Sequence, residues 1–457
     1  MAAANFSIEH RRTPERDPAL LHGARQSASR RRSMFDSLAH DGVKRPGTRE
    51  MTFMLAGLMA LNAFAIDAMV PALPAIGDSL RVTTENDRQL VVIAYFVGFA
   101  STQLFWGPLA DRFGRKPILA AGISLYTLFA LLCAFAGTFP LLIASRFAMG
   151  ASAAVTRVLV VAMVRDLFEA EAMARVMSLV FMTFMLVPVL APNIGQAILL
   201  VASWRAIFIV LAGYALLMLA WSAWRLPETL HPEFRRSLRW REMGGAMMEA
   251  VRDPLSRGYT LALASTFSAL IAYISSIQQI VFDVFDEGRY IGLVFAGIAA
   301  PMALASWLNS RFVGRFGLRR VGHSAAVMFA VITSLHALIG LTGHESLPVF
   351  VVMQSLAMAS FAFTSSNLGT LAMERMAPIA GTASSIQGVV GTLGAAIVGF
   401  AIGQAFDGTV RPYLIGCALA AIAALIIIVL TEPKRLFARL EPSRPATFGG
   451  CDPEDLC

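Results

Sequence analysis

Charged residues are scarce in this sequence, and their scarcity excludes an ordinary soluble protein. Asp, Glu, Lys and Arg make up 15% of the 457 residues, whereas an average soluble domain contains roughly 25%. Hydrophobic residues account for 56% of the chain, and the mean hydropathy is +0.64. The apolar residues gather into stretches of about 20, the length at which a helix crosses about 30 Å of hydrocarbon. The composition therefore predicts an all-α membrane protein.

Cysteine is also rare, and the motifs of several enzyme classes are missing. The four cysteines form neither a disulfide framework nor a zinc-binding spacing; they are Cys133, Cys417, Cys451 and Cys457. The sequence has no GxxxxGKS or GxxxxGKT loop and no HExxH motif, which argues against an ATP-driven pump and a zinc protease. We therefore expect no enzyme activity, no cofactor and no metal.

Twelve apolar runs bounded by charges, Gly or Pro are candidate transmembrane helices. They cover residues 51–73, 89–109, 117–137, 140–164, 174–199, 205–224, 258–282, 290–311, 321–342, 346–371, 380–405 and 411–431. The long connection after the sixth run contains LPETLHPEFRRSLRWREMGG and divides the runs into two sets of six. The resulting segments are a basic, disordered tail (1–50), a six-helix half (51–224), a cytosolic linker (225–257), a second six-helix half (258–431) and a cytosolic tail (432–457).

The net charge of +8 indicates membrane topology rather than nucleic-acid binding, because much of it lies in the N-terminal tail and in loops. Loops on the side of the N-terminus hold most of the loop Lys and Arg, as cytosolic loops do. The first 50 residues are too polar, and the apolar run after them too long, for a signal peptide. These features predict a multi-pass protein of the inner (plasma) membrane with both termini in the cytoplasm.

One carboxylate lies inside the first apolar run, in LNAFAIDAMVPALP. Asp67 is the only ionisable residue between Glu50 and Asp78. A charge at the bilayer centre costs about 2.5–3.5 kcal/mol on insertion scales, so such residues usually face an interior cavity and serve ions or substrates. Asp67 is therefore a candidate for proton or substrate binding.

Two arginines lie inside the fourth apolar run. Arg146 is expected about 9 Å below the external boundary, the same depth as Asp67. Burial favours a neutral carboxyl and a nearby arginine favours a charged one, so this pair could carry a proton; the alternative is a static ion pair that fixes helix positions. Arg157 follows eleven residues later on the same helix face, where it either lines a substrate cavity or extends its charge toward the cytosolic interface.

Other candidates are a bent helix and a set of polar residues within the apolar runs. Pro188, Pro192 and Gly195 occur within VPVLAPNIGQ and predict a hinge, although Gly and Pro are common in membrane helices in any case. The cavity candidates are Tyr95, Gln103, Tyr273, Gln278, Asn367 and Gln387. Such amides more often bond a neighbouring helix than a substrate.

The two halves contain similar loops at corresponding positions. GPLADRFGRKP follows the second run and LNSRFVGRFGLRR follows the eighth. Duplication of a six-helix unit is typical of transporters whose halves move about a central site; the alternative is coincidence between two basic loops.

The stretch GPLADRFGRKP resembles motif A of the major facilitator superfamily, which implies the major facilitator fold of twelve transmembrane helices. The resemblance assigns a conformational switch to Gly107, Asp111, Arg112, Gly114 and Arg115. Over residues 55–430 the chain is similar to Bcr/CflA-type drug:proton antiporters, through DAMVPALP, LVPVLAPNIGQ, LPETL and SSNLGTLAMERMAPIAG. This implies that Asp67 is the membrane acid and Arg146 the motif B arginine, and that Pro188, Pro192 and Gly195 form the antiporter motif.

The expected function is multidrug efflux, and hence antibiotic resistance, by proton-coupled antiport. The expected partners are a small-molecule substrate, protons and membrane lipid, and the protein is expected to be a monomer that binds no nucleic acid. Two alternatives stay open: coupled or facilitated transport of a specific metabolite, and a sensor or scaffold that keeps a transporter fold. DAMVP in place of Asp-Met-Tyr-Leu-Pro, and NIGQ without paired glycines, leave the substrate unassigned.

Overall fold

The computed structural model describes residues 47–168, 170–230, 233, 235, 240–376, 380–433, 436 and 437. Most of the expected N-terminal tail, part of the linker and nearly all of the C-terminal tail, including Cys451 and Cys457, lie outside the described residues.

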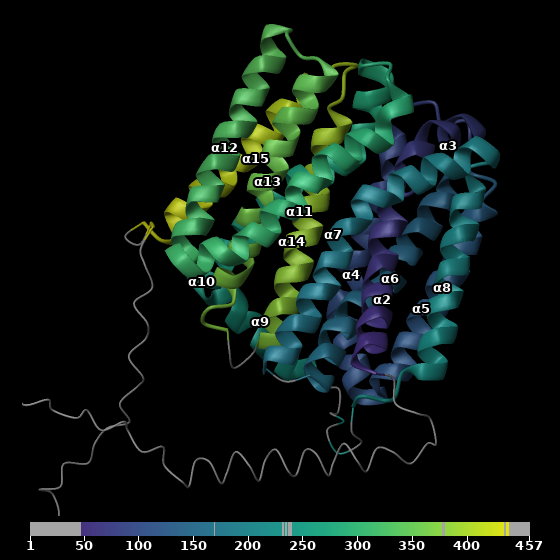
Figure 1. The fold of residues 1–457 in the computed structure, drawn as a ribbon, viewed down its shortest axis with the longest axis vertical. Coiled ribbons are helices and arrows are strands. Elements are labelled where there is room, and N and C mark those ends of the chain that lie inside the picture. The colour runs from purple at the N-terminus through teal and green to yellow at the C-terminus, as the bar shows by residue number, and fades with distance from the viewer. Residues whose placement is uncertain are drawn as a thin grey trace, which may run out of the picture. The chain divides into compact units, whose positions relative to one another are not determined.

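The first set of long helices contains the N-terminal candidates (Figure 1). Its long helices are α2 (Thr48–Asp67), α4 (Leu90–Phe113), α5 (Arg115–Ala134), α6 (Phe139–Leu167), α7 (Ala170–Val201) and α8 (Arg205–Arg225). Short elements join α2 to α4: η2 (Val70–Ala72), α3 (Leu73–Ser79) and η3 (Glu85–Gln89).

The second set follows α9 (Trp240–Arg252), a short helix in the linker. Its long helices are α10 (Pro254–Gln279), α11 (Ile291–Phe316), α12 (Leu318–Thr342), α13 (Leu347–Ala372), α14 (Ala380–Gln404) and α15 (Arg411–Thr431). Two short elements, η5 (Ile280–Val284) and η6 (Gly288–Tyr290), join α10 to α11.

Eleven helices of the described chain are long and apolar enough to cross a membrane. The long helix α7 is not among them, because its described apolar part covers only Leu186–Val201. The expected all-α membrane architecture is confirmed. The first run, expected as one helix over residues 51–73, is interrupted. Helix α2 ends at Asp67, and the following Pro71 and Pro74 lie at the starts of the 3-10 turn η2 and the short helix α3.

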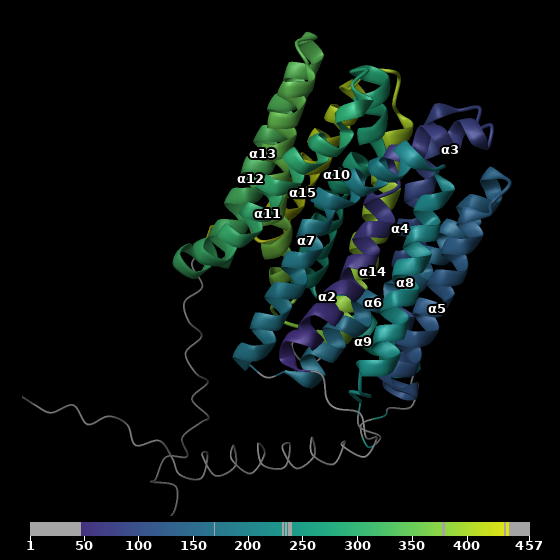
Figure 2. The ribbon, with the colours of Figure 1, turned by 45° about the vertical axis from the view of Figure 1, so that its right-hand side comes forward.

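The helices pack as two bundles that meet along two seams. In the first bundle α4 packs on α6, α5 on α6 and α8, and α2 on α7; in the second, α10 packs on α14 and α15, and α13 on α11 and α12. Between the bundles α7 contacts α11, and α4 contacts α14. Figures 1 and 2 show the purple-to-teal bundle beside the green-to-yellow one.

Hydrogen bonds between the bundles gather at the end of the structure that carries α3. We call this end the α3 end, and we call the opposite end, near α9, the α9 end. Four residues form a polar clasp at the α3 end: Asn86, Gln89, Gln279 and Gln404. Gln279 donates to Asn86 (3.0 Å), Gln89 bonds Gln279, and the Gln404 amide donates to the Asn86 carbonyl (2.9 Å). The element η3 is thereby hydrogen-bonded to the second bundle.

Candidate functional site

Asp67 is the last residue of α2 and lies directly before the proline-containing turn. Its side chain is buried, with 4% of the residue surface exposed. In the part of the chain that the structure describes, no hydrogen bond or ion pair reaches its carboxylate. Burial of a charged carboxylate without partners is strongly unfavourable; the expected function of Asp67 in proton or substrate binding stays a prediction.

Gly195 of α7 packs against the backbone beside Asp67. A Cβ atom at Gly195 would lie 1.9 Å from the carbonyl oxygen of Ala68. Only glycine therefore allows α7 to pass this close to the end of α2. The helix continues through Pro188 and Pro192, and the expected hinge function of these residues stays a prediction.

Arg146 is completely buried between three helices of the first bundle. Its Nε donates to the carbonyl oxygen of Val91 (2.9 Å) and its Nη1 to that of Ala65 (3.1 Å). The guanidinium also lies over the Tyr95 ring, 4.7 Å from the centroid. Among the described residues Arg146 makes no ion pair with Asp67. Instead it donates to the carbonyl oxygen of Ala65, which lies two residues before Asp67 on α2. Its expected function in proton coupling stays a prediction.

A hydrogen-bonded chain that the sequence did not predict lies about one helical turn before Asp67 along α2. The Tyr95 hydroxyl donates to Asn62 (3.1 Å), and the Asn62 amide donates to Thr156 (2.6 Å). Tyr95 is therefore a fully buried link between α4 and α2. An amide within the apolar first run, five residues before Asp67, was the signal that could have identified Asn62.

The cavity candidates of the second bundle divide into two groups. Asn367 donates to Asn309 (2.8 Å) and Gln387 to the Gly369 carbonyl (3.1 Å), so both bond neighbouring helices. Tyr273 and Gln278 are buried, and their hydroxyl and amide groups have no hydrogen-bond partner in the described structure. The helix that carries Tyr273, α10, contacts η2, the turn that follows Asp67, and so reaches the candidate site from the other bundle.

The remaining cavity candidates lie on α4 and α6. Gln103 is buried at the contact with α14, where its Oε1 would lie 2.5 Å from a Cβ added at Gly388. Arg157 is exposed, and its guanidinium carbon is 5.9 Å from the centroid of the Phe99 ring.

The motif A loop forms a charge cluster at the α9 end of the first bundle. Arg115 pairs with Asp111 (2.7 Å) and Asp166 (3.2 Å). Glu228 accepts from the backbone N–H groups of Arg115 (2.9 Å) and Lys116 (3.2 Å), at the N-terminus of α5. Gly114, with φ of 105°, ends α4 in a conformation that favours glycine.

Arg112 and Gly107 contribute differently to this loop. The guanidinium of Arg112 lies 5.1 Å from the Phe113 centroid, and a Cβ at Gly107 would contact Val158 at 3.8 Å. In this structure the buried Arg115, rather than the exposed Arg112, is the centre of the charge cluster.

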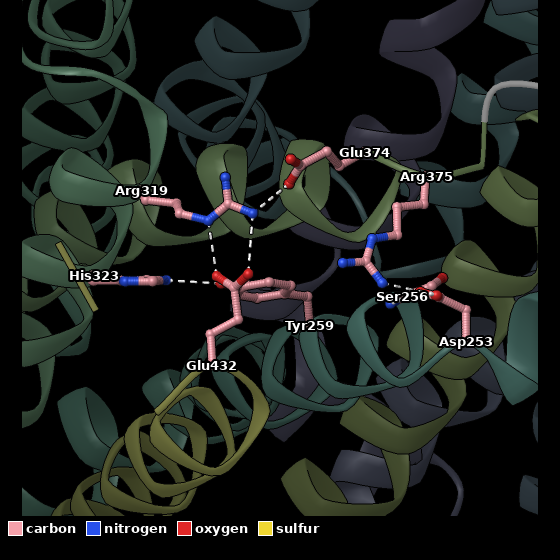
Figure 3. A network of polar contacts seen from close by, with 8 residues as sticks. All are labelled: Asp253, Ser256, Tyr259, Arg319, His323, Glu374, Arg375 and Glu432. Carbon is pink, nitrogen blue, oxygen red and sulfur yellow. Dashed lines mark hydrogen bonds and ion pairs between the residues drawn. The ribbon is translucent and has the colours of Figure 1, made fainter. Parts of the chain in front are cut away.

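The second bundle contains a matching cluster, shown in Figure 3. Arg319 bonds both oxygens of Glu432 (2.8 and 3.0 Å) and also Glu374 (2.6 Å). The Tyr259 hydroxyl donates to Glu432 (2.7 Å) and lies 2.9 Å from Nε2 of His323. Because the single hydroxyl proton goes to Glu432, Nε2 of His323 is the donor to Tyr259.

Glu432 lies just beyond α15 and stays ionised despite its burial. Burial raises the pKa of its carboxyl, but hydrogen bonds from Arg319 and Tyr259 outweigh that effect and hold the pKa below its ordinary value. Beside this cluster Asp253 caps α10 by accepting from the Ser256 N–H (2.7 Å) and pairs with Arg375 (3.7 Å).

The two clusters are built alike. Gly114 and Gly317 follow the same Arg-Phe dipeptide, and both have positive φ with ψ of 153°. In each bundle a buried arginine in the first turn of the third helix is bonded to an acid near the end of the fourth helix and to an acid after the sixth. Arg319 binds Glu374 and Glu432 with its guanidinium. Arg115 binds Asp166 with its guanidinium and Glu228 with its backbone N–H. The sequence predicted the loop similarity but missed these acids; the Leu-x-Glu at the end of both sixth helices was the available signal.

Comparisons with known proteins agree with this architecture. The sequence model of the Major Facilitator Superfamily matches residues 55–399. A bicyclomycin resistance protein homolog of Haemophilus influenzae is 30% identical over 386 residues, covering 84% of this chain and 96% of that protein. The multidrug resistance protein MdtL of Escherichia coli O157:H7 is 29% identical over 392 residues (83% and 94%).

A solved structure of similar fold is the xylose transporter XylE from E. coli in a partially occluded inward open conformation. It superimposes with a TM-score of 0.67 at 13% identity, covering 83% of this chain and 97% of that one. At this identity the likeness concerns the fold alone.

Proposed function

Since the chain belongs to the Major Facilitator Superfamily and is therefore a secondary transporter, we propose that it exports drug-like or amphiphilic small molecules in exchange for protons. The observation that carries the proposal is Asp67, a buried carboxyl without a bonded partner in the described structure, where a helix ends between the two bundles. Relatives at about 30% identity that are named for bicyclomycin and multidrug resistance support the substrate class.

The arrangement of contacts suggests which side of the transporter is open. The polar clasp joins the bundles at the α3 end, which the distribution of Lys and Arg predicts to be external. With that orientation the clasp closes the external entrance and the transporter accepts substrate from the cytoplasm. Opening of the clasp would expose Asp67 to external protons, whose entry supplies about 2.3 kcal/mol per charge per 100 mV.

Asp67→Asn tests the coupling. In inverted vesicles with an acidified lumen, the wild type should accumulate ethidium, and Asp67→Asn should not, because asparagine cannot exchange a proton. Asp78→Asn is the matched control, since Asp78 lies near the same end with an exposed side chain and a 3.9 Å contact to Arg88.

Normal insertion and an unchanged melting temperature should accompany the loss of transport. Full proton-driven accumulation by Asp67→Asn would refute the function of this residue. Release, rather than accumulation, of a compound on lumen acidification would favour proton-coupled metabolite transport instead.

A further inference from the structure

Arg157 is a cation within the membrane domain that the proton-coupling site does not use. It lies ten residues before the end of α6 at Leu167, or about 15 Å at 1.5 Å per residue. Its side chain is exposed, and within the described structure no hydrogen bond or ion pair reaches its guanidinium. A charge at this depth is expensive unless it faces a polar passage or a partner.

The surroundings of Arg157 place it near the seam between the bundles. The preceding residue, Thr156, is bonded by Asn62 of α2. The guanidinium itself lies over Phe99 of α4. One turn further along α4, Gln103 contacts α14 of the other bundle, so this face of α4 is turned toward the second bundle rather than toward lipid.

The acid of the proton site is too distant to neutralise Arg157. Asp67 has the depth of Arg146, whose guanidinium holds a carbonyl two residues before it. Arg157 lies eleven residues further along α6, which corresponds to about 16 Å. The two sites are therefore separated along the membrane normal, and each can be occupied independently.

We propose that Arg157 binds an anionic group of transported compounds, and that the substrates include amphiphilic organic anions. A guanidinium offers a planar set of donors that matches a carboxylate or sulfonate in a two-point contact. The ring of Phe99 beside it provides an apolar surface for an aromatic body. The inference rests on the proposed transport function but not on proton coupling.

Binding of 2-naphthoate and of its neutral isostere 2-naphthamide to the purified full-length protein tests this assignment. Equilibrium dialysis in detergent, without any gradient, should show naphthoate bound roughly tenfold to a hundredfold more tightly, as expected for a charge-assisted contact. Arg157→Gln should abolish the preference, and Arg157→Lys should retain part of it.

Arg311→Gln is the matched control. Arg311 also lies over a ring, 3.9 Å from the Trp307 centroid, but near the end of α11, so its removal should leave the preference unchanged. Because the dialysis uses no gradient, loss of the preference reports anion binding alone, whereas loss of ethidium accumulation by Asp67→Asn reports proton coupling, so the two failures are distinguishable. Equal binding of the two probes, no binding of naphthoate, or an unchanged preference in a folded Arg157→Gln protein would overturn the proposal.

Discussion

The contact between Gly195 and Ala68 allows the effect of one methyl group to be worked out. The added Cβ would lie 1.9 Å from the Ala68 oxygen, whereas real Cβ contacts stay above 3.0 Å. The backbones of α2 and α7 must therefore separate by at least about 1.1 Å in Gly195→Ala. Overpacking of this kind costs about 1–3 kcal/mol, against a gain of about 1 kcal/mol from the higher helix propensity of alanine.

Gly213→Ala isolates the steric part of this effect. Gly213 is a helical glycine of α8, and nothing lies within 4 Å of a Cβ added there. This variant should show the gain in helix propensity without the clash. The difference between the two variants is then the cost of separating α2 and α7 beside Asp67.

Thermal unfolding in detergent can be followed with a thiol-reactive dye, because Cys133 and Cys417 are buried and free. A background with Cys451→Ser and Cys457→Ser removes the thiols of the tail. We expect Gly195→Ala to melt roughly 2–5 °C below Gly213→Ala, with slower proton-driven transport. Equal melting temperatures would refute the close packing of α2 and α7 at this position.

Two further predictions concern the ends of the bundles. Glu432→Gln should lower stability by roughly 1.5–3 kcal/mol, because Arg319 loses a charged acceptor. Since the pKa of Glu432 is lowered in the folded state, its contribution is complete above about pH 4.5 and declines as the pH falls through that lowered value; melting of both proteins from pH 3 to 8 checks this. Gln89→Ala should loosen the polar clasp at Gln279, and a cysteine at Tyr273 should then react faster with maleimide applied from outside.

Each of these variants has a control on the surface. Glu287→Gln removes an acid whose partner Arg289 is mostly exposed, and such pairs contribute less than about 1 kcal/mol. Thr84→Ala changes an exposed residue before η3 and should leave maleimide labelling unchanged. A difference in melting temperature between the wild type and Glu432→Gln that stays constant down to pH 3 would contradict the argument about Glu432. Unchanged maleimide labelling in Gln89→Ala would contradict the argument about the polar clasp.

Hydropathy predicted the helices well because lipid provides no hydrogen bonds, so each crossing must be a long apolar helix. The partners of the charges were much harder to predict. Arg146 binds the carbonyl oxygens of Ala65 and Val91, and since every residue carries a carbonyl, no sequence pattern identifies them. Glu228 accepts from the backbone N–H of Arg115 in a segment more than 100 residues away, which only the folded chain brings near.

The two arginine clusters also have a consequence for biosynthesis. Glu228 and Glu432 follow the last helix of their respective bundles, so each cluster can close only after its six helices have been synthesised. Domains generally fold as units during synthesis, and the first bundle has all members of its cluster before α9 leaves the ribosome. Each cluster can therefore fix its bundle only after the sixth helix has been synthesised, and the first cluster can do so before the second bundle is made.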